Sequence, residues 1–132
     1  MDHLFTPQEA SRLLPDVKMK LKEIMERKKV ADTLKEDLER YSLVGFDTPE
    51  LAQRNQELDM VVKDLMMKVS ELEDLGLKVR DIDMGLVDFP AMRFGNMVFL
   101  CWRYGESDIE FWHPANEGFN GRKSLNAQVI SP

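Results

Sequence analysis

Apolar residues in the first half of the chain recur at spacings of three, four or their sum, which predicts two amphipathic helices. The first stripe begins after Pro15 and comprises Val17, Leu21, Ile24, Ala31, Leu34, Leu38 and Tyr41. The second stripe ends at Gly76 and comprises Leu51, Leu58, Val61, Val62, Leu65, Val69, Leu72 and Leu75. Residues 44–49 separate the two stripes, so we expect an antiparallel helical hairpin.

The start of the first helix carries a well-defined signal. Thr6 can cap the helix, and Pro7 suits its first position. Glu9 stands three residues after the cap, where its side chain can accept a hydrogen bond from the Thr6 backbone amide. Pro15 lacks a backbone donor and clashes with the preceding turn, which predicts a kink or a break there.

The connection between the helices and the distribution of charge both favour the hairpin. Gly45 can end the first helix, and Asp47 or Thr48 can cap the second. The first helix is basic early, with Lys18, Lys20, Lys22, Arg27, Lys28 and Lys29. The second is acidic late, with Asp64, Glu71, Glu73 and Asp74. A reversal at Gly45 places these opposite charges side by side as a solvated face.

After Gly76 the pattern changes to short alternating runs rich in aromatic residues, which predict β-strands. The expected strands are 86–93, 97–104 and 108–113, and 78–81 can add a fourth. The first two are joined by a two-residue turn at Gly95-Asn96, and Gly105-Glu106-Ser107 turns into the third.

The predicted fold is therefore α+β, in a single domain of residues 1–132. A long antiparallel helical hairpin (6–75) packs on a small antiparallel meander of three to four strands (76–113), and a loop-rich tail (114–132) follows.

Alternation along the strands sorts their side chains onto two faces. The core face is expected to carry Val87, Phe89, Ala91, Val98, Leu100, Trp102, Tyr104, Ile109 and Phe111, with Arg93 and His113 at its rims. The other face carries Asp88, Met92, Phe99, Cys101, Arg103, Asp108, Glu110 and Trp112. On the expected turns, Asp88 lies opposite Arg103 and Glu110 lies on the other side of Arg103. This row is either a cross-strand ion-pair ladder or part of a binding surface.

Most of the chain's chemically distinctive residues lie in this second half. Candidate ligand-binding residues are Asp88, Arg93, Trp102, Arg103, Glu106, Glu110, His113 and Arg122. The loop from Gly118 to Arg122 can hold an anion, or Phe119 can fix the tail to the core while Arg122 pairs with an acid. We favour the second interpretation, with Phe119 buried and Arg122 near Glu106 or Asp88.

The sequence contains no motif with an assigned reaction. His113 has Glu106, Glu110 and Glu117 as neighbours in the chain, but none stands at a recognised zinc spacing, so neither a metal site nor a cofactor is predicted. Cys101 lies mid-strand among apolar neighbours, which is typical of an inert core thiol. No Ser-His-Asp signature, phosphate loop or dinucleotide fingerprint is present.

Composition narrows the class of protein. The net charge of −6 argues against general nucleic-acid affinity. A single cysteine cannot form an internal disulfide, which favours the cytoplasm. The N-terminus lacks a signal-peptide pattern, and no apolar run is long enough for a membrane span.

Several motifs together resemble a known family. They are Phe5-Thr6-Pro7-Gln8-Glu9-Ala10, Leu13-Leu14-Pro15, Gly85-Leu86-Val87-Asp88-Phe89-Pro90, Leu100-Cys101-Trp102-Arg103-Tyr104-Gly105-Glu106, Trp112-His113 and Gly118-Phe119-Asn120-Gly121-Arg122. In this order they are similar to the small prokaryotic family catalogued as domain of unknown function 2203, across nearly the whole chain. The resemblance implies no activity, substrate or catalytic residue.

Two functions from different classes follow from the sequence. The first is a non-catalytic interaction module that forms a homodimer, because the small sheet is too short to cover both long helices and leaves apolar positions exposed. Phe99 and Trp112 on the outer sheet face add to that expected patch. The second is an enzyme or ligand-binding protein that uses the Arg, Glu, His and Trp residues of the sheet for an anionic small molecule.

Overall fold

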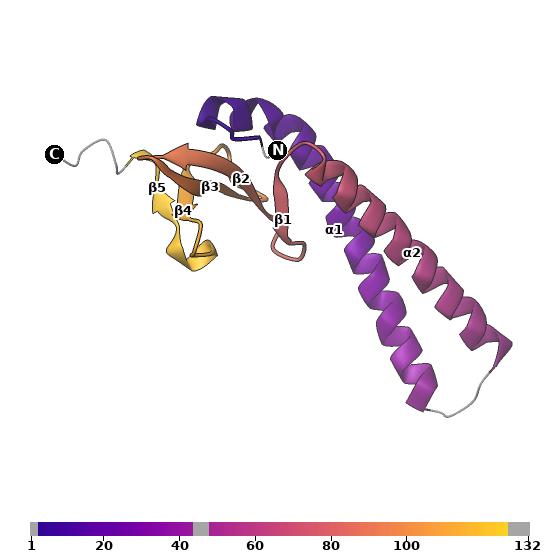
Figure 1. The fold of residues 1–132 in the computed structure, drawn as a ribbon. Helices are drawn as coiled ribbons and strands as arrows, with labels where there is room; N and C mark the ends of the chain where they lie inside the picture. Colours follow the sequence, from indigo (N-terminus) through magenta and orange to yellow (C-terminus); the bar gives the residue numbers. More distant parts are fainter. Residues whose placement is uncertain (1–2, 44–47, 127–132) are drawn as a thin grey trace.

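The computed structural model of the protein describes residues 3–43 and 48–126. The predicted helix end at Gly45 and the alternative cap Asp47 lie outside the described residues. Two helices pack together and continue into one antiparallel sheet, so the α+β prediction is confirmed. The helical hairpin extends well beyond the sheet, as Figure 1 shows.

The two helices are α1 (Pro7–Leu43) and α2 (Pro49–Glu73). The predicted capping box is present, because the Glu9 amide donates to Thr6 Oγ1 at 3.1 Å and the Thr6 amide donates to Glu9 Oε1 at 3.0 Å. Thr48 caps α2 by accepting a hydrogen bond from the Leu51 amide. Pro15 lies inside α1 and does not end it, although the first turns run at an angle to the rest of the helix (Figure 1).

Two ion pairs connect the helices, and the first of them, between Arg27 and Asp64, has the predicted polarity of a basic α1 and an acidic α2, whereas the second has the reverse. Arg27 Nε lies 3.1 Å from Asp64 Oδ2, and Lys68 Nζ lies 3.3 Å from Glu23 Oε2. These side chains are largely exposed, so each pair contributes at most about 1 kcal/mol to the free energy of unfolding.

The sheet has one strand more than the three to four predicted. Its strands are β1 (Lys78–Asp81), β2 (Leu86–Arg93), β3 (Asn96–Arg103), β4 (Phe111–Pro114) and β5 (Lys123–Ser124). They are antiparallel and adjacent in the order of the chain. The tail contributes β5 and a short 3₁₀ helix, η1 (Phe119–Gly121), so part of the predicted loop region belongs to the sheet.

The turn between β2 and β3 differs from the prediction by one residue. Arg93 pairs with Asn96, so the turn residues are Phe94 and Gly95 with φ of 53° and 77°. Two positive values are typical of a type I′ turn, whose second position strongly favours glycine. The pairing consequently shifts by two residues, and Asp88 lies opposite Cys101 rather than Arg103.

The third predicted strand is wrong in its start and in its faces. Residues 108–110 are not part of β4, which pairs Leu100 with Trp112 and Phe99 with His113. Trp112 therefore belongs to the core, while His113 lies on the outer face beside Phe99. The predicted row of Asp88, Arg103 and Glu110 does not form.

The core lies between the N-terminal part of α1, the C-terminal part of α2 and one face of the sheet. It includes Leu14, Val17, Leu21, Ile24, Leu65, Leu72, Val87, Phe89, Val98, Leu100, Trp102 and Trp112. No helix in the described part of the chain is long and apolar enough to cross a membrane.

Candidate functional site

The outer face of the sheet is covered rather than open to solvent. Phe99 and Cys101 are buried there. The Arg80 guanidinium from β1 lies 4.8 Å from the ring centre of Phe99, and Arg122 from the tail lies 4.2 Å from that of Phe111. Because side chains from β1 and the tail cover this face, polar groups on its middle strands are removed from water.

Asp88 is the central charged group beneath this cover. It is only 2% exposed; its Oδ2 accepts a hydrogen bond from Arg80 Nε at 2.9 Å and lies 3.0 Å from His113 Nε2. Among the described residues, its other oxygen, Oδ1, is buried without a hydrogen-bond partner. A buried acceptor of this kind costs free energy unless something satisfies it.

His113 approaches Asp88 from β4 and is also 2% exposed. Its second ring nitrogen, Nδ1, lies 2.9 Å from the carbonyl oxygen of Pro114. Both ring nitrogens therefore face oxygen atoms of the protein, and neither is open to solvent.

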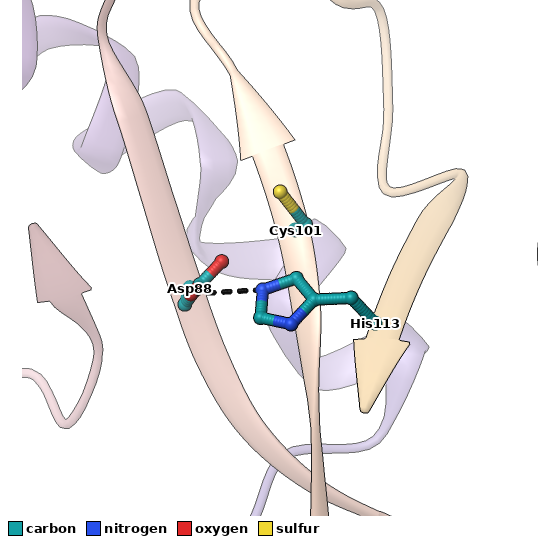
Figure 2. A group of neighbouring side chains, drawn as sticks. All are labelled: Asp88, Cys101 and His113. Carbon is teal, nitrogen blue, oxygen red and sulfur yellow. Dashed lines mark hydrogen bonds and ion pairs between the residues drawn. The ribbon is translucent and has the colours of Figure 1, made fainter. Parts of the chain in front are cut away.

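Cys101 completes a group of three side chains from neighbouring strands. Figure 2 shows Asp88 on β2, Cys101 on β3 and His113 on β4 directed toward a common point. One ligand atom from each lies within 4.8 Å of the others. Burial raises the pKa of the Cys101 thiol to about 12, and the charge of Asp88 adds to this effect. The thiol is consequently protonated at neutral pH and is a poor nucleophile.

A cleft of about 340 Å³ opens beside this group. Its lining includes Arg80, Asp88 and His113 from the strands, and residues 115–119 from the loop after β4. Its volume is at the lower end of the range for small-molecule sites, which is about 300–1,000 Å³.

The tail is held over the outer face by Arg122. Its Nη2 donates to Glu106 Oε1 at 2.6 Å and to the carbonyl oxygen of Cys101 at 3.1 Å. Burial acts to lower the pKa of Arg122, but the hydrogen bond and charge of Glu106 outweigh it, so the pKa is raised and the group stays charged. The predicted approach of Arg122 to Glu106 is confirmed, whereas Phe119, expected to be buried, is only half-buried.

The remaining candidate residues are not gathered at the cleft. Trp102 is fully buried in the core, where its Nε1 donates to the carbonyl oxygen of Glu106. Arg93 lies over Trp112 on the core face, and Glu110 is exposed beside Ser107. Arg103 is exposed and lies 5.8 Å from the ring centre of Phe119.

Sequence reasoning missed two residues of this region. Arg80 lies on a strand that was expected only as an addition, and Cys101 was interpreted as inert. Register could have revealed Cys101, because it pairs with Asp88. Arg80 lies at an irregularity between Val79 and Asp81, which the residue pattern does not signal. The metal interpretation considered Glu106, Glu110 and Glu117, whereas the side chains grouped with His113 are Asp88 and Cys101.

Comparison with known proteins supplies a family and no function. Searches of curated proteins and of solved structures gave no match. A family model matches residues 3–125, which include both helices and all five strands. The chain belongs to the family described as Uncharacterized conserved protein (DUF2203).

Proposed function

We propose that this protein binds a small anionic molecule in the cleft formed by β1, β2, β4 and the loop 115–119. The observation that carries this proposal is the position of Arg80 at a cleft that has two buried polar side chains in contact, Asp88 and His113, in its lining. Convergent polar groups in a concave site are the usual mark of ligand binding.

The charge of the lining favours an anion. Arg80 uses Nε for Asp88, which leaves the four N–H groups of its terminal nitrogens for a carboxylate or phosphate. The two carboxylates of the lining each have a cation nearby. Asp88 contacts Arg80, and Glu117 Oε2 lies 3.7 Å from Lys123 Nζ. An incoming anion therefore meets little uncompensated negative charge.

The same geometry favours binding over acid–base or nucleophilic catalysis. A general base needs a free nitrogen within hydrogen-bond reach of its substrate, and both nitrogens of His113 already face acceptors. The thiol of Cys101 is buried and protonated. A cytoplasmic location is part of this proposal, and its support is the single free cysteine.

Thermal unfolding with acetate, malonate and inorganic phosphate tests the ligand class. A ligand at 100 times its Kd adds about 2.7 kcal/mol to the free energy of unfolding, so we expect at least one of these anions to raise Tm by several degrees. Arg80→Gln should abolish the shift, measured against the Tm of the free variant.

Arg40→Gln is the matched control, because this arginine lies near the far end of α1 and is largely exposed. It should retain the full ligand-induced shift. The proposal fails if no anion of the panel shifts the wild-type Tm, or if Arg80→Gln responds like the control.

A second candidate function, a homodimeric interaction module, has its own supporting observation. Among the described residues, α1 has no fully buried side chain beyond Ala31, and α2 has none before Leu65. The half-buried apolar residues of this distal hairpin are Leu34, Leu38, Tyr41, Leu51, Leu58 and Val61. We infer that a second copy covers them in a four-helix arrangement. The outer sheet face offers no such support, since Phe99 is buried there and Trp112 belongs to the core on the other face.

Light scattering at micromolar concentration tests this second candidate. We expect the mass of a dimer for the wild type and a shift toward the monomer for Leu58→Arg, because a charge replaces part of the contact. Met19→Arg, at an exposed position of α1 near the sheet, should remain dimeric. A wild-type monomer across this range would contradict the dimer.

A further inference from the structure

Asp88, Cys101 and His113 form the most concentrated group of metal-ligating side chains among the described residues. They come from three adjacent strands, and all three are buried. Cys101 on β3 lies directly opposite Asp88 on β2. His113 on β4 lies opposite Phe99, two residues before Cys101, and is therefore a diagonal neighbour of Cys101. Because the ladder of the sheet fixes all three backbones, their side chains converge without any loop to hold them (Figure 2).

The first observation that points to an ion is the unused oxygen of Asp88. Arg80 and His113 both bind Oδ2, whereas Oδ1 is buried with no hydrogen-bond donor among the described residues. A carboxylate oxygen away from water needs a donor or a cation. One carboxylate oxygen of Asp88 lies within 4.8 Å of the ligand atoms of Cys101 and His113, so this carboxylate can bind a metal ion between them.

The second observation is the hydrogen-bond chemistry of His113. The carbonyl oxygen of Pro114 and an ionised Asp88 are acceptors only, yet each lies against a ring nitrogen. A neutral imidazole has a single N–H and can satisfy one of them. Two states of the ring leave neither nitrogen facing an acceptor without a proton or a cation between them. In the first, the ring is an imidazolium and donates from both nitrogens. In the second, a neutral ring donates Nδ1–H to the Pro114 carbonyl oxygen and presents the Nε2 lone pair to a cation. A ring whose other N–H donates to a backbone carbonyl is the usual arrangement of a metal-ligating histidine.

We propose that Asp88, Cys101 and His113 bind one transition metal ion of the zinc class. Imidazole nitrogen, thiolate sulfur and carboxylate oxygen together match the ligands of Zn²⁺. Cys101 becomes a thiolate by releasing its proton to solvent as the metal binds, so binding weakens as the pH falls. Three protein ligands with one remaining position are typical of zinc sites that accept a further ligand. Asp88 and His113 line the cleft, so the remaining position is on the cleft side.

The distances fit this ion after a small closure. Metal–ligand bonds of about 2.0–2.3 Å in a tetrahedron separate the ligand atoms by about 3.5 Å. The three atoms here lie within 4.8 Å of one another. Arg80 remains on Oδ2 and holds the carboxylate from outside, as outer-shell partners commonly do. The site does not depend on the organic anion proposed above.

Metal titration of the full chain tests the site directly. Wild-type protein, free of any affinity tag and treated with a chelator, is titrated with Zn²⁺ by calorimetry in a buffer without organic anions. We expect one Zn²⁺ per chain. With Co²⁺ as a probe, a thiolate-to-metal charge-transfer band should appear, because the sulfur of Cys101 becomes a ligand.

Substitutions then separate the proposed site from binding elsewhere. Cys101→Ser, which preserves size, and His113→Gln should each weaken Zn²⁺ binding by at least about 10-fold, the smallest loss typical even of outer-shell partners. His3→Gln is the matched control, since His3 is the only other histidine and lies outside the group. It should bind like the wild type.

Three results would overturn the proposal: no stoichiometric Zn²⁺ binding by the wild type, a cobalt complex without the thiolate band, or loss of binding in His3→Gln but not in Cys101→Ser. All three are measured without organic anion. A failure here therefore leaves the anion proposal standing, and a failure of the anion test leaves this one standing.

Discussion

Asp88→Ala is expected to lower the free energy of unfolding by about 1–3 kcal/mol, which is typical when a buried polar group loses its hydrogen-bond partner. The carboxylate accepts a hydrogen bond from Arg80 and contacts Nε2 of the buried His113 ring. Without it, the ring of His113 stays buried with one nitrogen unsatisfied, and Arg80 loses its counter-charge. Chemical denaturation followed by circular dichroism measures the change, with a chelator present so that bound metal does not contribute.

Asp83→Ala is the matched control for this substitution. Its side chain is 71% exposed and pairs with Lys28 at 3.2 Å. A surface pair of this kind contributes about 1 kcal/mol or less. Equal losses for Asp83→Ala and Asp88→Ala would mean that water already solvates the group around Asp88, which would contradict its described burial.

Trp102→Ala is expected to lower the free energy of unfolding by about 3–5 kcal/mol, because it opens a large cavity in the core. Trp102 has no exposed surface, and its Nε1 donates to the carbonyl oxygen of Glu106 at 3.1 Å. The substitution therefore removes apolar packing and also leaves a carbonyl oxygen unpaired. The loss is measured by denaturation at equilibrium.

Phe94→Ala provides the comparison, since it also replaces an aromatic residue by alanine in the sheet. Phe94 is 72% exposed at the β2–β3 turn, so the expected change is within about 0.5 kcal/mol. If Trp102→Ala were as mild as Phe94→Ala, the assignment of Trp102 to the centre of the core would be wrong.

The sequence predicted the fold class but not the contacts of the site. Apolar periodicity defined both helices, and alternation assigned Val87, Phe89 and Leu100 correctly to the core. The same alternation could not choose between a turn at Phe94-Gly95 and one at Gly95-Asn96. Moving the turn by one position shifts the partner by two residues and leaves every side chain on its own face.

The third strand failed for a different reason. Residues 108–110 were expected to continue the alternation, but they are irregular, and β4 begins at Phe111. When an irregular segment of unknown length precedes a strand, alternation can no longer be followed through it to decide which face each later side chain is on. The prediction therefore placed Trp112 on the outer face and His113 at the rim of the core face, the reverse of their actual positions.

The sequence by itself determined the features that depend on interactions between residues close in the chain. Helical spacing, the Thr6–Glu9 capping box and the Thr48 cap are set by residues close in the chain, and all are present. The tertiary structure alone decided that Asp88, Cys101 and His113 meet beneath the cover of β1 and the tail. Their meeting depends on strand register and on which side of the sheet the tail folds, and neither is encoded in the spacing of apolar residues.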